Sequence, residues 1–279
     1  MTQELYYRRI GVGEPVIILH GMYGSSDNWF TVGKALSENF EVYMIDQRNH
    51  GHSPHDPEIS YPLLRDDLRD FLDLHDLWKV TIIGHSMGGK AAIFFAAAFP
   101  HRVKKLIIID IAPGSYKNLL KPSDLVLDHL NIIQSLLDLD PEKIESRTEA
   151  DLKLAETIKS VAVRQFLLKN LVRNKAGKFE WALNLVAIQK GLPALMDGID
   201  VKQVAEGLRI TGFPVLFIRG GNSEYIKAED EIFIKKLFPD AEIKTIEGAG
   251  HWVHSEKTEE FIRVVKEFCY KNILILKLD

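Results

Sequence analysis

Six short and almost entirely apolar runs recur along the chain, and stretches with helical spacing separate them. The runs cover residues 16–20, 42–46, 80–84, 106–110, 215–219 and 243–246. Runs of this kind are typical of strands that are buried on both faces of a parallel sheet. Their alternation with helices predicts an α/β fold, with a mostly parallel central sheet and helices on both of its faces.

The strand-like runs stop between residues 112 and 208, where apolar residues follow a helical period. We therefore expect residues 1–112 and 208–279 to form one α/β core and residues 113–207 to form an all-helical cap. Gly177 and Gly191 are predicted to separate helices of this cap. The last residues, 273–278, indicate a strand or a tail to which we assign no function.

The charge balance of the chain narrows the classes of partner. Its 279 residues contain 35 Lys and Arg against 39 Asp and Glu, a net charge of −4. No basic field is present to bind nucleic acid or an anionic membrane, which favours a small-molecule substrate. Because the chain shows no signal-like start and no apolar run of membrane length, a cytoplasmic protein is expected. Its oligomeric state is left open.

The motif Gly-x-Ser-x-Gly at residues 84–88 carries the chemistry, because a strand-like run precedes it and a helical stretch follows it. This context predicts a sharp turn that exposes the hydroxyl of Ser86 as a nucleophile at the edge of the sheet. A competing interpretation is a P-loop, since residues 84–90 also fit Gly-x4-Gly-Lys. The residue after Lys90 is Ala91, which lacks the hydroxyl that a P-loop uses to hold its metal ion.

A nucleophilic serine needs a base and an oxyanion hole. His251 is the predicted base, because it follows the last strand-like run on a glycine-containing loop. The predicted oxyanion donors are the backbone N–H of Met87 and that of Met22, in the loop after the first apolar run. His20 is interpreted as a side chain that shapes this loop. The candidate substrate-binding residues are Tyr23, Tyr116, Trp181 and Trp252.

A metal site is the alternative suggested by the cluster of His50, His52 and His55 beside Asp56. The spacing matches no common ligand pattern. We instead interpret residues 46–56 as a tight loop in which Arg48 pairs with an internal carboxylate. No metal and no cofactor are predicted.

Several segments together carry a family resemblance: residues 20–25, 46–53, 84–90, 109–113, 219–223 and 250–252. On these the chain resembles the α/β-hydrolases, and among them the YbfF-like small esterases. The resemblance covers nearly the whole core. It implies the α/β-hydrolase fold and hydrolysis of short- to medium-chain acyl esters or thioesters, without a cofactor.

The acid that would orient His251 is the point at which the chain departs from the family pattern. Most members place an aspartate three residues after the glycine that here is Gly220, and this chain has Ser223 there. Asp110 and Glu224 remain as candidates. Asp110 is favoured because it ends an apolar run, where a buried carboxylate needs a polar partner. Glu224 is the alternative acid.

These residues predict a serine esterase that works through an acyl-enzyme intermediate. Two other interpretations stay open at this stage. The same fold supports carbon–carbon hydrolases, lyases and perhydrolases. A ligand-binding protein without catalysis is the third possibility, and the missing acid at Ser223 agrees with it.

Overall fold

A seven-stranded sheet forms the centre of the computed structural model, which describes residues 4–116 and 124–271. Its strand order is β1-β3-β2-β4-β5-β8-β9, and every neighbouring pair is parallel except β1 with β3. The strands are β1 (Tyr7–Ile10), β2 (Glu14–Leu19), β3 (Phe40–Ile45), β4 (Val80–His85), β5 (Val103–Ile109), β8 (Val215–Gly220) and β9 (Glu242–Ile246). All six predicted runs are therefore strands. The sequence analysis missed β1, a short strand in which no residue is fully buried.

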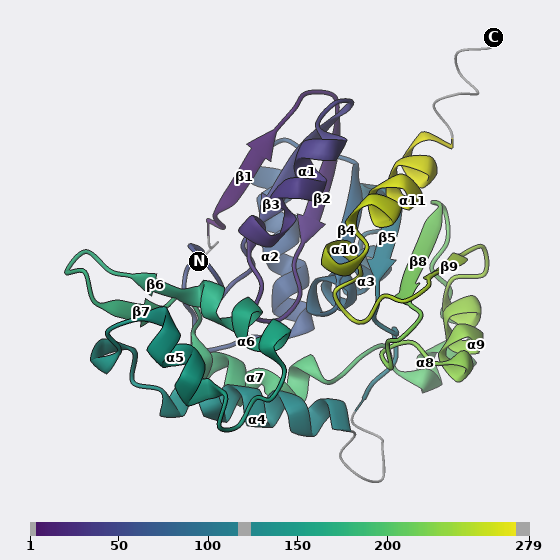
Figure 1. Ribbon diagram of the computed structural model, residues 1–279. Coiled ribbons are helices and arrows are strands. Elements are labelled where there is room, and N and C mark those ends of the chain that lie inside the picture. The colour runs from purple at the N-terminus through teal and green to yellow at the C-terminus, as the bar shows by residue number, and fades with distance from the viewer. Residues whose placement is uncertain (1–3, 117–123, 272–279) are drawn as a thin grey trace.

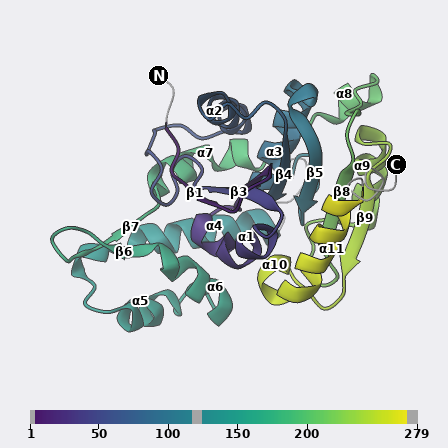
Figure 2. The ribbon, with the colours of Figure 1, turned by 90° about the horizontal axis from the view of Figure 1, so that it is seen from above.

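Helices cover both faces of the sheet, as predicted (Figure 2). One apolar cluster joins the sheet to α2 (Tyr61–Leu74), α3 (Met87–Ala98) and α9 (Ala228–Leu237). The other joins it to α1 (Phe30–Leu36), α10 (Val253–Glu256) and α11 (Thr258–Tyr270). Successive side chains of a strand point to opposite faces, so Ile17 belongs to the first cluster and Ile18 to the second. This explains why the central strands are largely apolar along their length.

The segment between β5 and β8 forms a cap that lies across the carboxyl ends of the parallel strands (Figure 1). Its helices are α4 (Asp124–Asp138), α5 (Arg147–Leu154), α6 (Val161–Leu167), α7 (Leu185–Leu195) and α8 (Val201–Ala205). Short 3-10 turns complete the described chain at Ser26–Trp29, Pro100–Arg102, Pro141–Lys143 and Leu168–Asn170.

The expectation of an all-helical cap was wrong in one place. A hairpin of β6 (Leu171–Arg173) and β7 (Phe179–Trp181) interrupts the helices. Gly177 lies in its turn with a φ of 80°, a conformation that glycine adopts without strain. Gly191 also does not separate helices, because it lies inside α7. A Cβ there would come within 2.3 Å of Ile59, so glycine lets α7 pack closely on the core.

Two further expectations concerned the C-terminal residues and membrane-spanning segments. Residues 273–278, predicted as a strand or tail, lie outside the described residues. Among the residues that are described, no helix has the length and apolar character needed to cross a membrane.

Candidate active site

The predicted nucleophile, Ser86, occupies a strained turn between β4 and α3. Its φ of 52° and ψ of −118° are unusual for a residue with a side chain, and its backbone N–H donates to Ile109 at 3.0 Å. The flanking glycines make the turn possible: a Cβ on Gly84 would lie 2.5 Å from the carbonyl of Gly88, and one on Gly88 would lie 2.5 Å from that of Leu19. The sequence therefore folds here into the strand–turn–helix that the motif predicts.

Asp110 and His251 are in direct contact. Asp110 follows the last residue of β5 with a φ of 49° and is fully buried. Its Oδ2 lies 2.8 Å from His251 Nδ1, and its Oδ1 accepts a hydrogen bond from the backbone of Gly220 at 3.0 Å. The hydroxyl of Ser223 donates to the same Oδ2. The buried carboxylate thus has three donors, which compensate for its desolvation.

Glu224, the alternative acid, is exposed. Its carboxylate forms no hydrogen bond or ion pair with the part of the chain that the structure describes. The structure therefore brings Asp110, and not Glu224, into contact with His251.

Two further histidines, His85 and His254, lie near His251, and burial keeps both neutral near pH 7. His85 donates from Nε2 to the carbonyl oxygen of His251 at 2.9 Å. Burial lowers the pKa of His85 well below its ordinary value, and the neighbouring histidines lower it further. Burial likewise lowers the pKa of His254, to about 3. Near neutral pH these two rings are therefore uncharged supports for the histidine that contacts the carboxylate.

Ser86 and His251 line one cavity of about 200 Å³ between the core and the cap. The core also contributes Met22, Tyr23, Tyr225 and Trp252, and the cap contributes Asp128, His129, Ile132, Val163, Phe166 and Leu167. A second, smaller cavity of about 20 Å³ adjoins Ser86, and its walls include Met22, Met87, Tyr116 and Met196. A wider surface hollow along α11 contains none of the predicted site residues. The larger of the two cavities at Ser86 is the one that brings the serine and His251 together.

The candidate substrate-binding residues divide into two groups. Tyr23 and Trp252 line the larger cavity, and Tyr116 lines the smaller one. Trp181 lines neither, because it lies in β7 of the cap hairpin. The sequence analysis did not single out His129 and Tyr225, which line both cavities.

The predicted oxyanion donors lie beside Ser86. Met22 and Met87 both contribute to the walls of the smaller cavity, and Met87 is the first residue of α3. The first N–H groups of a helix have no partner within the helix. Within residues 4–116 and 124–271, neither the Met22 nor the Met87 amide donates a backbone hydrogen bond.

His20 shapes the loop after β2, as predicted. Its Nδ1–H donates to the carbonyl of Gly21 at 2.8 Å, and its Nε2 accepts from the backbone N–H of Gln47 at 2.9 Å. Burial lowers its pKa, which favours this neutral tautomer. Both ring nitrogens are thus used in fixing the loop that carries Met22.

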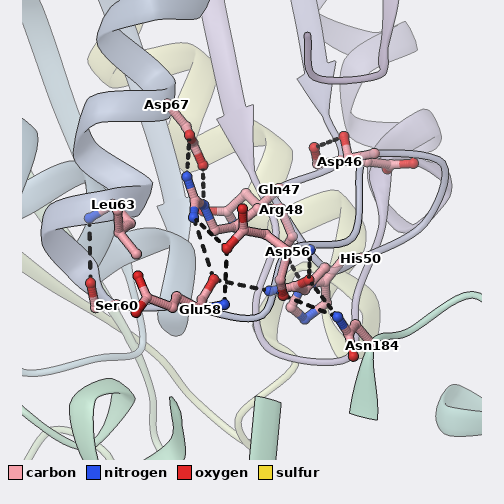
Figure 3. Close-up of polar contacts among 12 residues, drawn as sticks. Asp46, Gln47, Arg48, His50, Asp56, Glu58, Ser60, Leu63, Asp67 and Asn184 are labelled. Carbon is pink, nitrogen blue, oxygen red and sulfur yellow. Dashed lines mark hydrogen bonds and ion pairs between the residues drawn. The ribbon is translucent and has the colours of Figure 1, made fainter. Parts of the chain in front are cut away.

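The histidine-rich segment after β3 is a loop held by polar contacts (Figure 3). Arg48 forms a bidentate pair with Asp67, at 2.5 and 2.6 Å, which confirms the predicted internal pairing. The carboxylate of Asp46 accepts from the backbone N–H of Ser26 at 2.6 Å and of His52 at 2.9 Å. No group of three or more metal-binding side chains is found among the described residues. These contacts show that polar residues of this segment fix the conformation of its loop.

The P-loop interpretation has no support in the position of Lys90. Its side chain is 1% exposed, and its Nζ donates to the carbonyl oxygens of Gly114 and Asp197. A P-loop lysine must instead reach the phosphates of a nucleotide. Here Lys90 links the backbone near the start of the cap, at Gly114, to the backbone before α8, at Asp197.

Comparison with known proteins agrees with this geometry. The family model described as the alpha/beta hydrolase fold matches residues 14–258. The chain belongs to the α/β-hydrolase family. Esterase YbfF of Escherichia coli is 34% identical over 254 residues, which are 91% of this chain and 92% of that protein.

Two further relatives extend the comparison. The Xenopus laevis protein named sn-1-specific diacylglycerol lipase ABHD11 is 36% identical, over 96% of this chain and 83% of its own. The solved structure titled "Marine microorganism esterase" is 44% identical, with a TM-score of 0.89 over 95% of this chain and 99% of that one. The predicted family and its YbfF-like branch are thereby confirmed.

Proposed function

We propose that this protein is a serine ester hydrolase whose catalytic residues are Ser86, His251 and Asp110. One observation carries the proposal: a strained serine and a histidine bonded to a buried carboxylate line the same cavity. The names of its relatives, esterases and a lipase, support the reaction class. We further propose that it acts in the cytoplasm on small molecules and without a cofactor.

The proposed reaction follows from the roles that these groups can take. Ser86 attacks the acyl carbonyl while His251 Nε2 accepts the hydroxyl proton. Asp110 holds Nδ1 and stabilises the imidazolium that forms. The N–H groups of Met22 and Met87 receive the developing negative charge on the carbonyl oxygen. His251 then protonates the departing alcohol or thiol, and water activated by His251 releases the acid from the acyl-enzyme.

The walls of the larger cavity support an uncharged acyl substrate. Five apolar side chains line it: Met22, Ile132, Val163, Phe166 and Leu167. Burial of apolar groups against such side chains contributes roughly 25 cal/mol per Å². We therefore propose that its substrates are short- to medium-chain acyl esters or thioesters.

The experiment that tests this function is turnover of p-nitrophenyl acetate, butyrate and octanoate, with the matching thioesters. Wild type is expected to hydrolyse at least one chain length, and Ser86→Ala is expected to lose activity by more than about 10³-fold. Glu224→Gln, an exposed change beside the site, is the matched control and should keep wild-type rates. Equal rates in wild type and Ser86→Ala would reject the serine mechanism. Binding without turnover would favour a ligand-binding protein.

A further inference from the structure

Tyr225 lies where the core, the cap and His251 meet. Its ring is stacked on the imidazole of His251, with centroids 3.7 Å apart and planes inclined by 16°. This contact covers one face of the imidazole whose Nδ1 is bonded to Asp110. Tyr225 follows β8 on the same loop as Ser223, whose hydroxyl donates to that carboxylate. One loop therefore touches both members of the Asp110–His251 pair.

Hydrogen bonds from the core hold the backbone of Tyr225. Its N–H donates to the Ser223 hydroxyl oxygen at 3.3 Å, and its carbonyl oxygen accepts from the Tyr116 hydroxyl at 2.7 Å. The Tyr116 hydroxyl in turn accepts from the backbone N–H of Ala112, at 3.1 Å. The ring of Tyr225 is thus fixed relative to the ends of both β5 and β8.

The cap holds the other end of the side chain. The hydroxyl of Tyr225 lies 3.2 Å from Nε2 of His129 in α4, and Nδ1 of the same ring lies 3.3 Å from the hydroxyl of Tyr23. Burial lowers the pKa of His129 to about 4, so near pH 7 one of its nitrogens donates and the other accepts. His129 can therefore bridge two tyrosine hydroxyls from the core.

We propose that Tyr225 is a positioning residue for His251 and that His129 makes this positioning depend on the cap. The inference rests on the proposed serine mechanism. A ring lying flat on the imidazole opposes its rotation away from Asp110. The aromatic face also attracts a cation, and in the proposed mechanism an imidazolium forms when His251 takes the proton of Ser86. The contact therefore acts mainly on kcat.

Other titratable groups near His251 come from four elements of the core and the cap. His85 at the end of β4, His254 in α10 and His129 in α4 are neutral near pH 7, because burial lowers the pKa of each. Asp110 after β5 is in contact with His251, and Asp128 of α4 is exposed at the cavity wall. Among these groups, His129 loses its contact with the Tyr225 hydroxyl when the ring is removed. Tyr225→Phe removes that contact alone, so comparing the two variants isolates the effect of the ring.

The test compares kcat and KM for an activated ester from pH 4.5 to 9 in four variants. Tyr225→Leu removes the ring, and Tyr225→Phe keeps it without the hydroxyl. His129→Leu removes the bridge to the cap, and Asn131→Ala changes an exposed residue of the same helix as a control. The unfolding midpoint of each variant and the NMR titration of the His251 ring are measured beside the kinetics.

We expect Tyr225→Leu to lower kcat about 10-fold, with KM changed less than about 2-fold, and to move the acidic limb of the rate profile about 0.5 to 1 pH unit lower. The NMR titration should move with it. Tyr225→Phe should restore the wild-type limb. His129→Leu should lower kcat about 3-fold without moving the limb, and Asn131→Ala should match wild type.

Different results would reject different parts. An unmoved limb and titration in a folded Tyr225→Leu would overturn the positioning role. Wild-type kcat in His129→Leu would overturn the dependence on the cap. If wild type itself hydrolyses no ester, the proposed function fails rather than this inference alone.

Discussion

The neighbouring strands β5 and β8 end beside the same histidine, but they contribute different groups to it. β5 is followed by Asp110, whose carboxylate contacts His251 Nδ1. β8 is followed by Ser223, whose hydroxyl donates to that carboxylate, and by the exposed Glu224. The position where the family pattern places an acid thus holds a donor to an acid on the next strand.

In the proposed mechanism a carboxylate is needed at one point in space, beside His251 Nδ1, rather than on one particular strand. Because β5 and β8 are adjacent and parallel, their carboxyl ends reach the same edge of the sheet. Either loop can therefore approach His251. Once Asp110 occupies the place beside Nδ1, the loop after β8 is free to stabilise the pair.

The largest expected effect tests which strand supplies the acid. Asp110→Asn should lower kcat by about 10³- to 10⁴-fold, because the amide cannot stabilise the imidazolium and favours the wrong tautomer of His251. Asparagine also tolerates the positive φ at this position. Steady-state kinetics on an activated ester measure the effect, and Glu224→Gln is the control. A loss in Glu224→Gln with normal rates in Asp110→Asn would assign the acid to β8.

A second-site change tests whether the two loops are interchangeable. Ser223 already contacts the carboxylate oxygen that bonds His251. The double variant Asp110→Asn/Ser223→Asp should therefore regain about 10- to 100-fold of the kcat lost in Asp110→Asn. The measurement is kcat of both proteins at the same pH. No recovery in a folded double variant would show that the loop after β8 cannot direct a carboxylate to Nδ1.

A smaller effect is expected when only the donor is removed. Ser223→Ala deletes one hydrogen bond to the carboxylate of Asp110, a type of bond that contributes roughly 1.5 to 3 kcal/mol, and the weaker bond that the Tyr225 N–H donates at 3.3 Å. We expect kcat to fall about 10-fold because Asp110 keeps its contacts with Gly220 and His251. Ser255→Ala, an exposed serine in α10, serves as the control. Wild-type kcat in Ser223→Ala would mean that the loop after β8 contributes nothing to the pair.

The smallest expected effect compares His251 with His254, for which the described residues offer no carboxylate partner. Burial lowers the pKa of His254 to about 3, from an ordinary value of 6.5. Below pH 6.5 the unfolded chain binds a proton there that the folded chain does not, so stability present above pH 6.5 is lost as the pH falls toward 3. The ring of His254 stacks on that of Trp29, with centroids 4.1 Å apart, and a phenylalanine ring can keep this contact.

His254→Phe should therefore lose about 1 kcal/mol less of its free energy of unfolding than wild type between pH 6.5 and 5.5. Urea unfolding at the two pH values measures the difference. Equal losses in the two proteins would mean that His254 does not contribute to acid sensitivity.

The sequence predicted six strands of the central sheet and the turn at Ser86 because their signals are local. Continuous apolar runs mark strands that are buried on both faces, and the spacing of Gly84, Ser86 and Gly88 specifies a turn that other residues cannot form. Asp110 was also predictable, since an acid that ends a buried strand needs a partner.

The cap contacts could not be predicted in the same way. His129 of α4 and Phe166 of α6 line the same cavity as Tyr225, which follows β8. Helical periodicity shows which face of a helix is apolar, but not how the helix is placed over the core. For the same reason Trp181 was proposed for the substrate site and lies instead in a hairpin that the sequence analysis did not predict.

The most direct test of the central claim is the rate at which a fluorophosphonate labels Ser86, located by peptide mass spectrometry. This reaction needs an activated serine but no knowledge of the substrate. Wild type and Glu224→Gln should be labelled at Ser86 at similar rates, and Asp110→Asn should be labelled far more slowly. Rapid labelling of Asp110→Asn, or none at Ser86 in folded wild type, would contradict a serine activated through His251 by the carboxylate after β5.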